Sequence, residues 1–177
     1  YIATHLADSP IITRLRRKIP PLRLRTPVGM TCLDCYLKSM RGLMRASGKT
    51  LGIIDTPGVN SLVPMSEDER VTRDILLNED LESVIQVLDA KNLRRSLLIT
   101  LQLIEMELPL TLALNMYDEA GERGIKINAG LLTNTLGVDI VPTIATQSWN
   151  MDKLKDALFS PRKAQYVTRY HTAIEDG

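Results

Sequence analysis

The sequence has few aromatic residues, few cysteines and no long apolar run. One tryptophan and one phenylalanine occur among 177 residues, and both cysteines lie in a single motif, Cys32-Leu33-Asp34-Cys35. One such pair supplies half of a four-thiolate zinc site, and neither histidine lies at a spacing that completes it. We therefore expect two reduced thiols. No apolar run approaches the roughly 18 residues of a membrane span, so the sequence predicts no transmembrane helix.

Acidic residues are scarce at the amino-terminal end. The whole chain has a net charge of +1, so no overall field indicates nucleic acid or a membrane surface as a partner. Residues 1–30 contain the single acid Asp8 and these basic residues: Arg14, Arg16, Arg17, Lys18, Arg23 and Arg25. A nucleic-acid-binding arm or a transit peptide has a similar composition. We favour a solvated, poorly ordered segment and assign residues 1–26 to a divergent basic amino-terminal segment.

Past residue 50, short apolar runs alternate with stretches of helical periodicity. The predicted strands are 51–55, 83–90, 109–118 and 138–145, and the predicted helices are 66–77, 93–108, 128–137 and 150–158. Ser66 stands three residues before Glu69, a capping box that opens a helix. The alternation predicts an α/β fold with a mainly parallel sheet covered by helices on both faces. Ligands bind such sheets at the carboxyl ends of the strands.

The residues after the third and fourth predicted strands have the character of guanine readers. The Asp118 carboxylate can accept hydrogen bonds from guanine N1–H and from the exocyclic amine, whereas adenine offers neither donor there. Asn115 can brace neighbouring loops, and Met116 offers an apolar stem for the face of the base. The loop formed by Thr143, Ile144 and Ala145 has small residues where a backbone N–H can reach guanine O6.

The first predicted strand ends in Asp55-Thr56-Pro57-Gly58, which suits the phosphate end of a nucleotide. Asp55 can orient Mg²⁺ through water, and the Gly58 N–H can meet a terminal phosphate because no Cβ intervenes. Thr31, farther upstream, offers a hydroxyl as another Mg²⁺ ligand. Taken singly, Asp55 can be a turn former, and Asn115 and Asp118 can be loop residues that cap a helix. Their joint order and spacing favour a GTPase.

The sequence resembles the cytoplasmic G domain of the bacterial ferrous iron transport protein B (FeoB) family over about residues 27–177. The resemblance rests on these stretches: PVGMT, DTPGVNSLVPMSEDERVTRDILL, VLDAKNLRRSLLITLQLIEMELPLTLALNMYDEA, RGIKIN and LGVDIVPTIAT. It implies a P-loop GTPase (Ras-like) fold over residues 27–160. Residues 161–177 resemble the start of the helical domain that follows in the family, truncated here.

The resemblance also implies a function. Family members bind GTP and hydrolyse it slowly with Mg²⁺, and this is coupled to Fe²⁺ uptake by downstream helical and membrane domains. A monovalent cation, K⁺, can assist, and the protein lies at the cytoplasmic face of the bacterial inner membrane; this fragment is expected to be soluble. Val59 stands where many small GTPases keep a water-orienting glutamine, so intrinsic turnover should be slow.

The phosphate-binding loop of the family, G-x-x-x-x-G-K-[ST], is missing from residues 1–30. A near-match between Gly42 and Thr50 has five residues between its glycines and falls where the fold needs a hairpin turn. A phosphate cradle must instead open a helix, so we predict a β-turn there. The sequence thus leaves three hypotheses: a Mg²⁺-dependent GTPase domain of an iron transporter, a degenerate module that does not hydrolyse GTP, and, less favoured, an RNA- or ribosome-associated GTPase.

Overall fold

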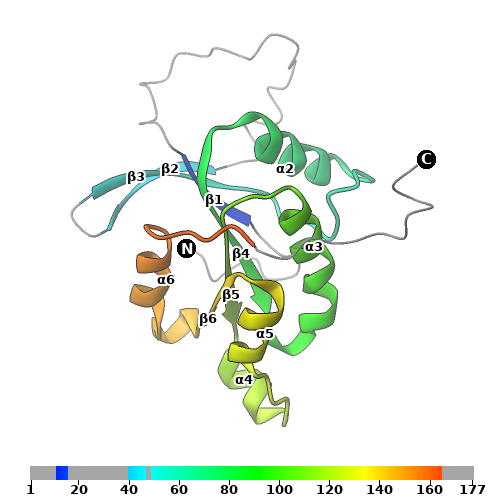
Figure 1. Ribbon diagram of the computed structural model, residues 1–177, viewed down its shortest axis with the longest axis vertical. Coiled ribbons are helices and arrows are strands. Elements are labelled where there is room, and N and C mark those ends of the chain that lie inside the picture. The colour runs from blue at the N-terminus through cyan, green and yellow to red at the C-terminus, as the bar shows by residue number, and fades with distance from the viewer. Residues whose placement is uncertain (1–10, 16–39, 47–48, 165–177) are drawn as a thin grey trace.

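The structure is a computed structural model that describes residues 11–15, 40–46 and 49–164. These residues form a six-stranded sheet in the order β2-β3-β1-β4-β5-β6, flanked by helices (Figure 1). The strands are β1 Ile11–Leu15, β2 Met40–Ala46, β3 Lys49–Asp55, β4 Leu81–Asp89, β5 Leu110–Asn115 and β6 Asp139–Pro142. The helices are α2 Glu67–Asn78, α3 Leu93–Glu105, α4 Tyr117–Glu122, α5 Ala129–Leu136 and α6 Met151–Ala157, with short 3-10 turns η1 Ala90–Asn92 and η2 Ala145–Gln147.

The parallel half of the sheet consists of β4, β5 and β6. Every residue of β5 is buried, as expected for a strand that helices cover on both faces. Leu112 packs in one core cluster with Ile99 and Leu103 of α3. Ala113, its neighbour on the opposite face, packs in a second cluster with Leu154 of α6. The side chains of this apolar run therefore pack into two core layers, one on each face of the sheet.

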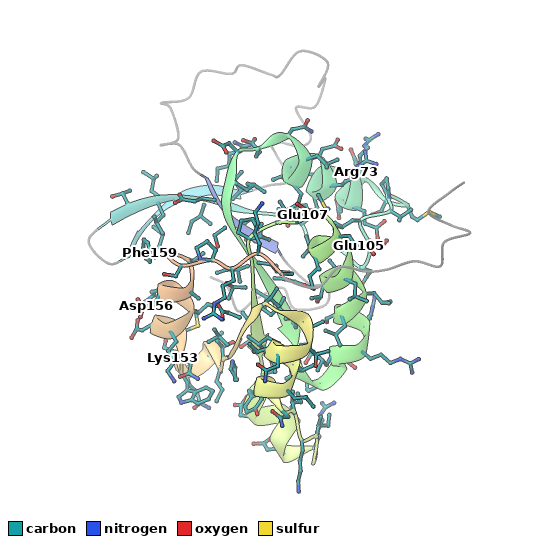
Figure 2. All side chains as sticks on the ribbon, viewed as in Figure 1. Arg73, Glu105, Glu107, Lys153, Asp156 and Phe159 are labelled. Atoms are coloured by element: carbon teal, nitrogen blue, oxygen red, sulfur yellow. The ribbon has the colours of Figure 1, made fainter. Side chains whose placement is uncertain are left out.

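The helices lie on both sides of the sheet, with α6 on one side and α2, α3 and α5 on the other (Figure 1). Helix α6 is amphipathic: Leu154 and Leu158 are buried, whereas Lys153 and Asp156 lie on its outer side (Figure 2). An apolar stripe at this spacing buries one face of a helix against the sheet.

Each strand and helix predicted beyond residue 50 is present, but several boundaries differ. Strand β5 ends at Asn115 rather than at Asp118, because Met116 adopts a left-handed conformation with φ 56° and α4 begins at Tyr117. Helix α3 ends at Glu105, and Glu107 beyond it is also left-handed. Helix α4 was not predicted, since a polar six-residue helix shows too little periodicity in the sequence.

Strand β1 fills the central position of the sheet but runs antiparallel to both of its neighbours. Ile12 pairs with Asp55 of β3 and with Ile85 of β4, and Leu15 pairs with Gly52 and Leu81. The expectation of a solvated, poorly ordered amino-terminal segment is therefore wrong for Ile11–Leu15. Because β3 and β4 are both antiparallel to β1, they run in the same direction as each other. The carboxyl ends of β3, β4, β5 and β6 thus share one edge.

The near-match to a phosphate-binding loop lies in an antiparallel hairpin. Strands β2 and β3 pair along their whole length: Met40 lies opposite Asp55 at one end, and Ala46 lies opposite Lys49 at the other. The lysine and threonine of this stretch therefore begin a strand, and neither opens a helix. The predicted pairing of two strands is confirmed, whereas residues 47–48 of the predicted turn lie outside the described residues. The described part of this stretch offers no phosphate cradle of the kind that requires a helix amino terminus.

A buried polar network joins β4 to α3. The Thr100 hydroxyl donates to Gln86 Oε1 at 2.8 Å, and Gln86 Nε2 donates to the Ser96 carbonyl oxygen at 3.0 Å. Gln86 and Thr100 are both fully buried. Because an unpaired polar atom in a core loses its hydration without compensation, this network requires each of its members.

Replacing Thr100 with valine should destabilise the fold by about 1–3 kcal/mol, because the Gln86 amide oxygen loses its hydroxyl donor in the core. Urea unfolding followed by circular dichroism measures the change. Thr135→Val is the matched control, since the exposed Thr135 hydroxyl bonds only to the Leu131 carbonyl oxygen of its own helix. We expect the control to change stability by less than about 0.5 kcal/mol. Equal effects of the two variants would contradict the assignment.

Candidate functional site

Asn115 lies at the carboxyl end of β5 and joins it to the loop after β6. Its side chain is buried, and its Oδ1 accepts hydrogen bonds from the Ala145 N–H at 3.0 Å and from the Thr143 hydroxyl at 3.4 Å. Backbone bonds add to this connection: the Thr143 N–H donates to the Leu114 carbonyl oxygen at 2.8 Å. The structure thus brings together Asn115, Thr143 and Ala145, with Ile144 between the last two.

Asp118 lies in the first turn of α4 and faces the same loop. Its Oδ2 accepts a hydrogen bond from Gln147 Nε2 at 3.4 Å. The left-handed turn at Met116 places Asp118 at the start of the helix, where the helix dipole favours a negative charge. The Lys91–Glu119 ion pair, at 2.6 Å, holds α4 against η1. The Asp118 carboxylate is half-buried and already accepts a hydrogen bond from an amide N–H. A carboxylate in this setting can also accept hydrogen bonds from N–H donors of a ligand.

Asp89 lies at the carboxyl end of β4. Its carboxylate accepts hydrogen bonds from the Lys91 N–H at 2.8 Å and from Asn92 Nδ2 at 3.0 Å, and it caps η1. Both carboxylate oxygens are therefore used within the turn. This capping positions Lys91 for its ion pair with Glu119.

The segment Asp55–Gly58 leaves β3 at the same edge of the sheet. Helix α2 holds it, because the Thr72 hydroxyl donates to the Pro57 carbonyl oxygen at 3.2 Å. Farther along the chain, Gln102 of α3 accepts a hydrogen bond from the Leu62 N–H at 2.9 Å. Asp55 is exposed, but partial desolvation by the surrounding protein raises the pKa of its carboxyl above the ordinary value. The carboxyl group of Asp55 lies at the end of β3, at the carboxyl edge of the sheet.

Val59 lies directly after Gly58 and is almost fully buried, with 1% of its surface exposed. It packs in the core cluster that contains Leu62 and Leu103. A buried hydrocarbon side chain can neither donate to nor accept from a water molecule. Its burial anchors the segment after β3 rather than presenting a group to a ligand.

The direction of the central strand, β1, determines whether a phosphate-binding loop could follow it. A strand that leads into a phosphate-binding loop must run toward the edge where Asp55 lies, but β1 starts at that edge and runs away from it. Among the described residues, no helix opens beside β1 at the edge where the segment Asp55–Gly58 lies. Thr31 and the Cys32–Cys35 pair lie outside the described residues. Within the described ranges, no cluster of three or more histidine, cysteine or acidic side chains forms a ready-made metal site.

An apolar cavity lies between the sheet and α6 and reaches the base-reading residues. Ile53, Ile85 and Val87 form its sheet side. Asn115, Thr143 and Ala145 also line it. The cavity joins the middle of the sheet to the edge at which the predicted site residues meet.

Several residues of this edge were not predicted from the sequence. Thr72 and Gln102 contact the segment after β3 through hydrogen bonds between distant positions. Gln147 contacts Asp118, and Trp149 stacks on Tyr117 with ring centroids 6.4 Å apart. Only Trp149 carried a signal, because it is the single tryptophan of the sequence and lies four residues after the predicted guanine loop.

The sheet order and the two groups of residues at one edge define a GTPase-type G domain. A family model described as ferrous iron transport protein B matches residues 36–158. The chain belongs to this family, which confirms the predicted resemblance and fold class. Among the described residues, no helix has the length and apolar character needed to cross a bilayer.

The comparisons with individual proteins agree with the family. An Fe(2+) transport protein A/Fe(2+) transporter FeoB fusion protein of Porphyromonas gingivalis is 38% identical over 125 residues, which cover 70% of this chain and 15% of that protein. The Fe(2+) transporter FeoB of Escherichia coli K12 is 34% identical over 125 residues, covering 68% of this chain and 16% of that protein. This chain therefore spans about one sixth of these curated relatives.

Two solved structures show the same fold. The FeoB G-domain from Methanococcus jannaschii is 39% identical with a TM-score of 0.66, covering 68% of this chain and 75% of that chain. The cytosolic domain of the T. maritima FeoB iron transporter in GDP form II is 30% identical with a TM-score of 0.74, covering 86% of this chain and 60% of that chain.

The segment after β3 ends in the predicted capping box. The Glu69 carboxylate accepts from the N–H groups of Met65 and Ser66, at 2.9 and 3.0 Å, and the Ser66 hydroxyl accepts from the Glu69 N–H at 3.3 Å. The hydrogen bond from Met65 is the main cause that lowers the pKa of the Glu69 carboxyl. The charged form of Glu69 therefore stabilises the start of α2.

Replacing Glu69 with glutamine should destabilise the protein at neutral pH and should matter less in acid. Because folding lowers the pKa of Glu69, its stabilising contribution is present above its ordinary pKa of 4.5 and is lost as the pH falls through the folded value. Urea unfolding of both proteins between pH 7 and pH 3 tests this. The gap between the two free energies of unfolding should narrow below about pH 4.5. A gap that stays constant would refute the role of the charge.

Proposed function

We propose that this chain is the GTP-binding regulatory domain of a ferrous iron (Fe²⁺) membrane transporter. The observation that supports it most is the meeting of Asn115, Ala145 and Asp118 at the sheet edge that also carries Asp55–Gly58, in a chain of the FeoB family. Related T. maritima structures are described as GDP and GMPPNP forms. The family relation favours this function over an RNA- or ribosome-associated GTPase.

Guanine would be recognised by the loops after β5 and β6. The Asp118 carboxylate accepts from N1–H and the exocyclic amine of the base, and these donors replace Gln147 Nε2, which lies 3.4 Å away. Met116 offers its apolar stem to one face of the ring. The Ala145 N–H already donates to Asn115 Oδ1, so it reaches guanine O6 by sharing its hydrogen between two acceptors. Thr143 and Ile144 shape the loop that presents it.

The phosphates would meet the segment after β3. Asp55 would hold Mg²⁺ together with phosphate oxygens and water, and Thr31 is the second proposed protein ligand. Thr56 and Pro57 position the Gly58 N–H, which faces a terminal phosphate without a Cβ in the way. The ion would neutralise phosphate charge, and K⁺ is a further candidate cation of the site. Val59 cannot orient the attacking water, so backbone groups or another segment would have to hold it.

A second candidate function is a G-domain module that binds guanine nucleotide weakly and does not hydrolyse it. The reversed direction of β1 favours this alternative, because residues 16–39, which follow that strand, contain no G-x-x-x-x-G-K-[ST] loop. In P-loop GTPases that loop contacts the β- and γ-phosphates and provides most of the phosphate recognition. Without it, the contacts to the base contribute the larger share of the affinity.

The other proposals concern the intact transporter. This domain would act with downstream helical and membrane domains, at the cytoplasmic face of the bacterial inner membrane. Residues 161–177 would begin the helical domain. Because the chain spans about 15% of a curated relative, the coupling of nucleotide binding to Fe²⁺ transport rests on domains beyond it.

Replacing Asp118 with asparagine should exchange guanine specificity for xanthine specificity. The variant loses the carboxylate acceptor for the guanine amine, while its amide can donate to the C2 oxygen of xanthine. Calorimetric titration with GDP, XDP and ADP measures this. GDP should bind at least about tenfold more weakly to the variant, equivalent to about 1.4 kcal/mol. Equal affinity of the wild-type chain for GDP and ADP would contradict the guanine site.

The 177-residue chain should bind GTP no more tightly than roughly the millimolar range, about −4 kcal/mol, and should not hydrolyse it measurably. A variant in which a strand–GxxxxGKS–helix segment replaces residues 1–26 should recover micromolar binding and slow turnover, because it restores the backbone cradle and lysine. Phosphate release at saturating GTP and Mg²⁺ compares the two. Equal turnover by both chains would favour the enzyme over the degenerate module.

A further inference from the structure

The loop after β6 closes on itself at Trp149. The Ile144 N–H donates to the Trp149 carbonyl oxygen at 3.4 Å, and the Trp149 N–H donates to the Ile144 carbonyl oxygen at 3.1 Å. The two residues therefore form an isolated antiparallel bridge. Ala145 and Gln147, which contact Asn115 and Asp118, lie inside this closed loop. The position of Trp149 thus fixes the segment that carries the contacts to both base readers.

The Trp149 ring reaches from this loop to the neighbouring one. It stacks on Tyr117, the residue before Asp118, with centroids 6.4 Å apart and an interplanar angle of 19°. The Tyr117 hydroxyl donates to the Ile127 carbonyl oxygen at 3.1 Å, and its N–H donates to the Thr143 carbonyl oxygen at 3.4 Å. Tyr117 is therefore held at both its hydroxyl and its backbone. Trp149 stacks on a ring whose place is already set.

The backbone around Trp149 is bent to allow this contact. Ser148 and Asn150, on either side of it, are both left-handed, with φ 56° and φ 59°. Left-handed backbone is unfavourable for residues other than glycine and persists where surrounding contacts compensate for it. Asn150 Nδ2 donates to the Pro142 carbonyl oxygen at 2.9 Å, which ties the far end of the loop to β6. The Trp149 side chain remains 45% exposed to solvent, so burial alone does not account for its placement.

We propose that Trp149, through its stack on Tyr117, is a positioning residue for guanine recognition. The stack joins the loop of Asp118 to the loop of Ala145, and so it sets the separation of the two groups that read the edge of the base. This inference rests on the proposed function, because it assumes that the edge binds a guanine nucleotide. Its specific consequence is that loss of the indole weakens discrimination of the base rather than nucleotide affinity in general.

The test compares GDP with IDP, whose inosine base lacks the exocyclic amine that Asp118 accepts. Ligand-observed NMR on the whole chain measures both dissociation constants, also when they are millimolar. The variants are Trp149→Leu, which keeps an apolar side chain, Trp149→Phe, which keeps a ring, and Leu131→Ala as a matched control, since Leu131 is 62% exposed on α5. Urea unfolding confirms that each variant is folded.

We expect the wild-type chain to bind GDP about tenfold more tightly than IDP, as one charge-assisted hydrogen bond predicts. Trp149→Leu should reduce this ratio to about threefold or less, while Trp149→Phe and Leu131→Ala should keep it. A ratio that is unchanged in Trp149→Leu overturns the positioning role while leaving the guanine site intact. Failure of the wild-type chain to bind either nucleotide overturns the proposed function, and the role of Trp149 with it.

As a second measurement, the indole N–H of Trp149 gives a single assignable signal, because the chain has one tryptophan. If the ring stacks as described, Tyr117→Leu should shift this signal in the absence of any nucleotide, since the ring current of the tyrosine is removed. Leu131→Ala should leave it in place. An indole signal that is insensitive to Tyr117→Leu overturns the stack itself, whatever the nucleotide measurements give.

Discussion

The site depends on the hydrogen bonds of one buried amide, the Asn115 side chain at the end of β5. Its surface is 3% exposed, and a buried polar group must find partners within the protein. Those partners come from the loop after β6: the Ala145 N–H and the Thr143 hydroxyl. Meeting this requirement fixes where the chain goes after β6, and the same loop then brings Gln147 to Asp118. The arrangement proposed to read the base thus follows from two adjacent parallel strands and one buried amide whose oxygen is hydrogen-bonded.

Much of the fold follows from local sequence pattern. The apolar runs that predict β3, β4 and β5 are buried in two core layers, and the capping box of Ser66 and Glu69 forms as its spacing predicts. The order of the polar residues after each strand places them at one edge, because parallel strands end on the same side. Asn115 and Asp118 could therefore be selected as candidates without coordinates. Their contacts could not, since these join positions about 30 residues apart.

Other features could not be predicted, for identifiable physical reasons. The direction of β1 depends on its long-range pairing with β3 and β4, and a five-residue strand has the same alternation of side chains whichever way it runs. The early end of β5 depends on the left-handed conformation of Met116, which an ordinary side chain adopts only under tertiary constraint. The Trp149–Tyr117 stack likewise joins two separate loops.

These dependencies separate the two ends of the site. The guanine end is built from β5, β6 and the loops that follow them, which are neighbours in both sequence and space. The phosphate end requires in addition a strand that enters between β3 and β4 and runs toward Asp55, whereas β1 occupies that place in the opposite direction. Among the described residues, the side-chain hydrogen bonds of Asn115 and Asp118 go to the loop after β6 and not to β1. In this chain, the geometry proposed to read the base therefore forms independently of the strand on which the proposed phosphate end depends.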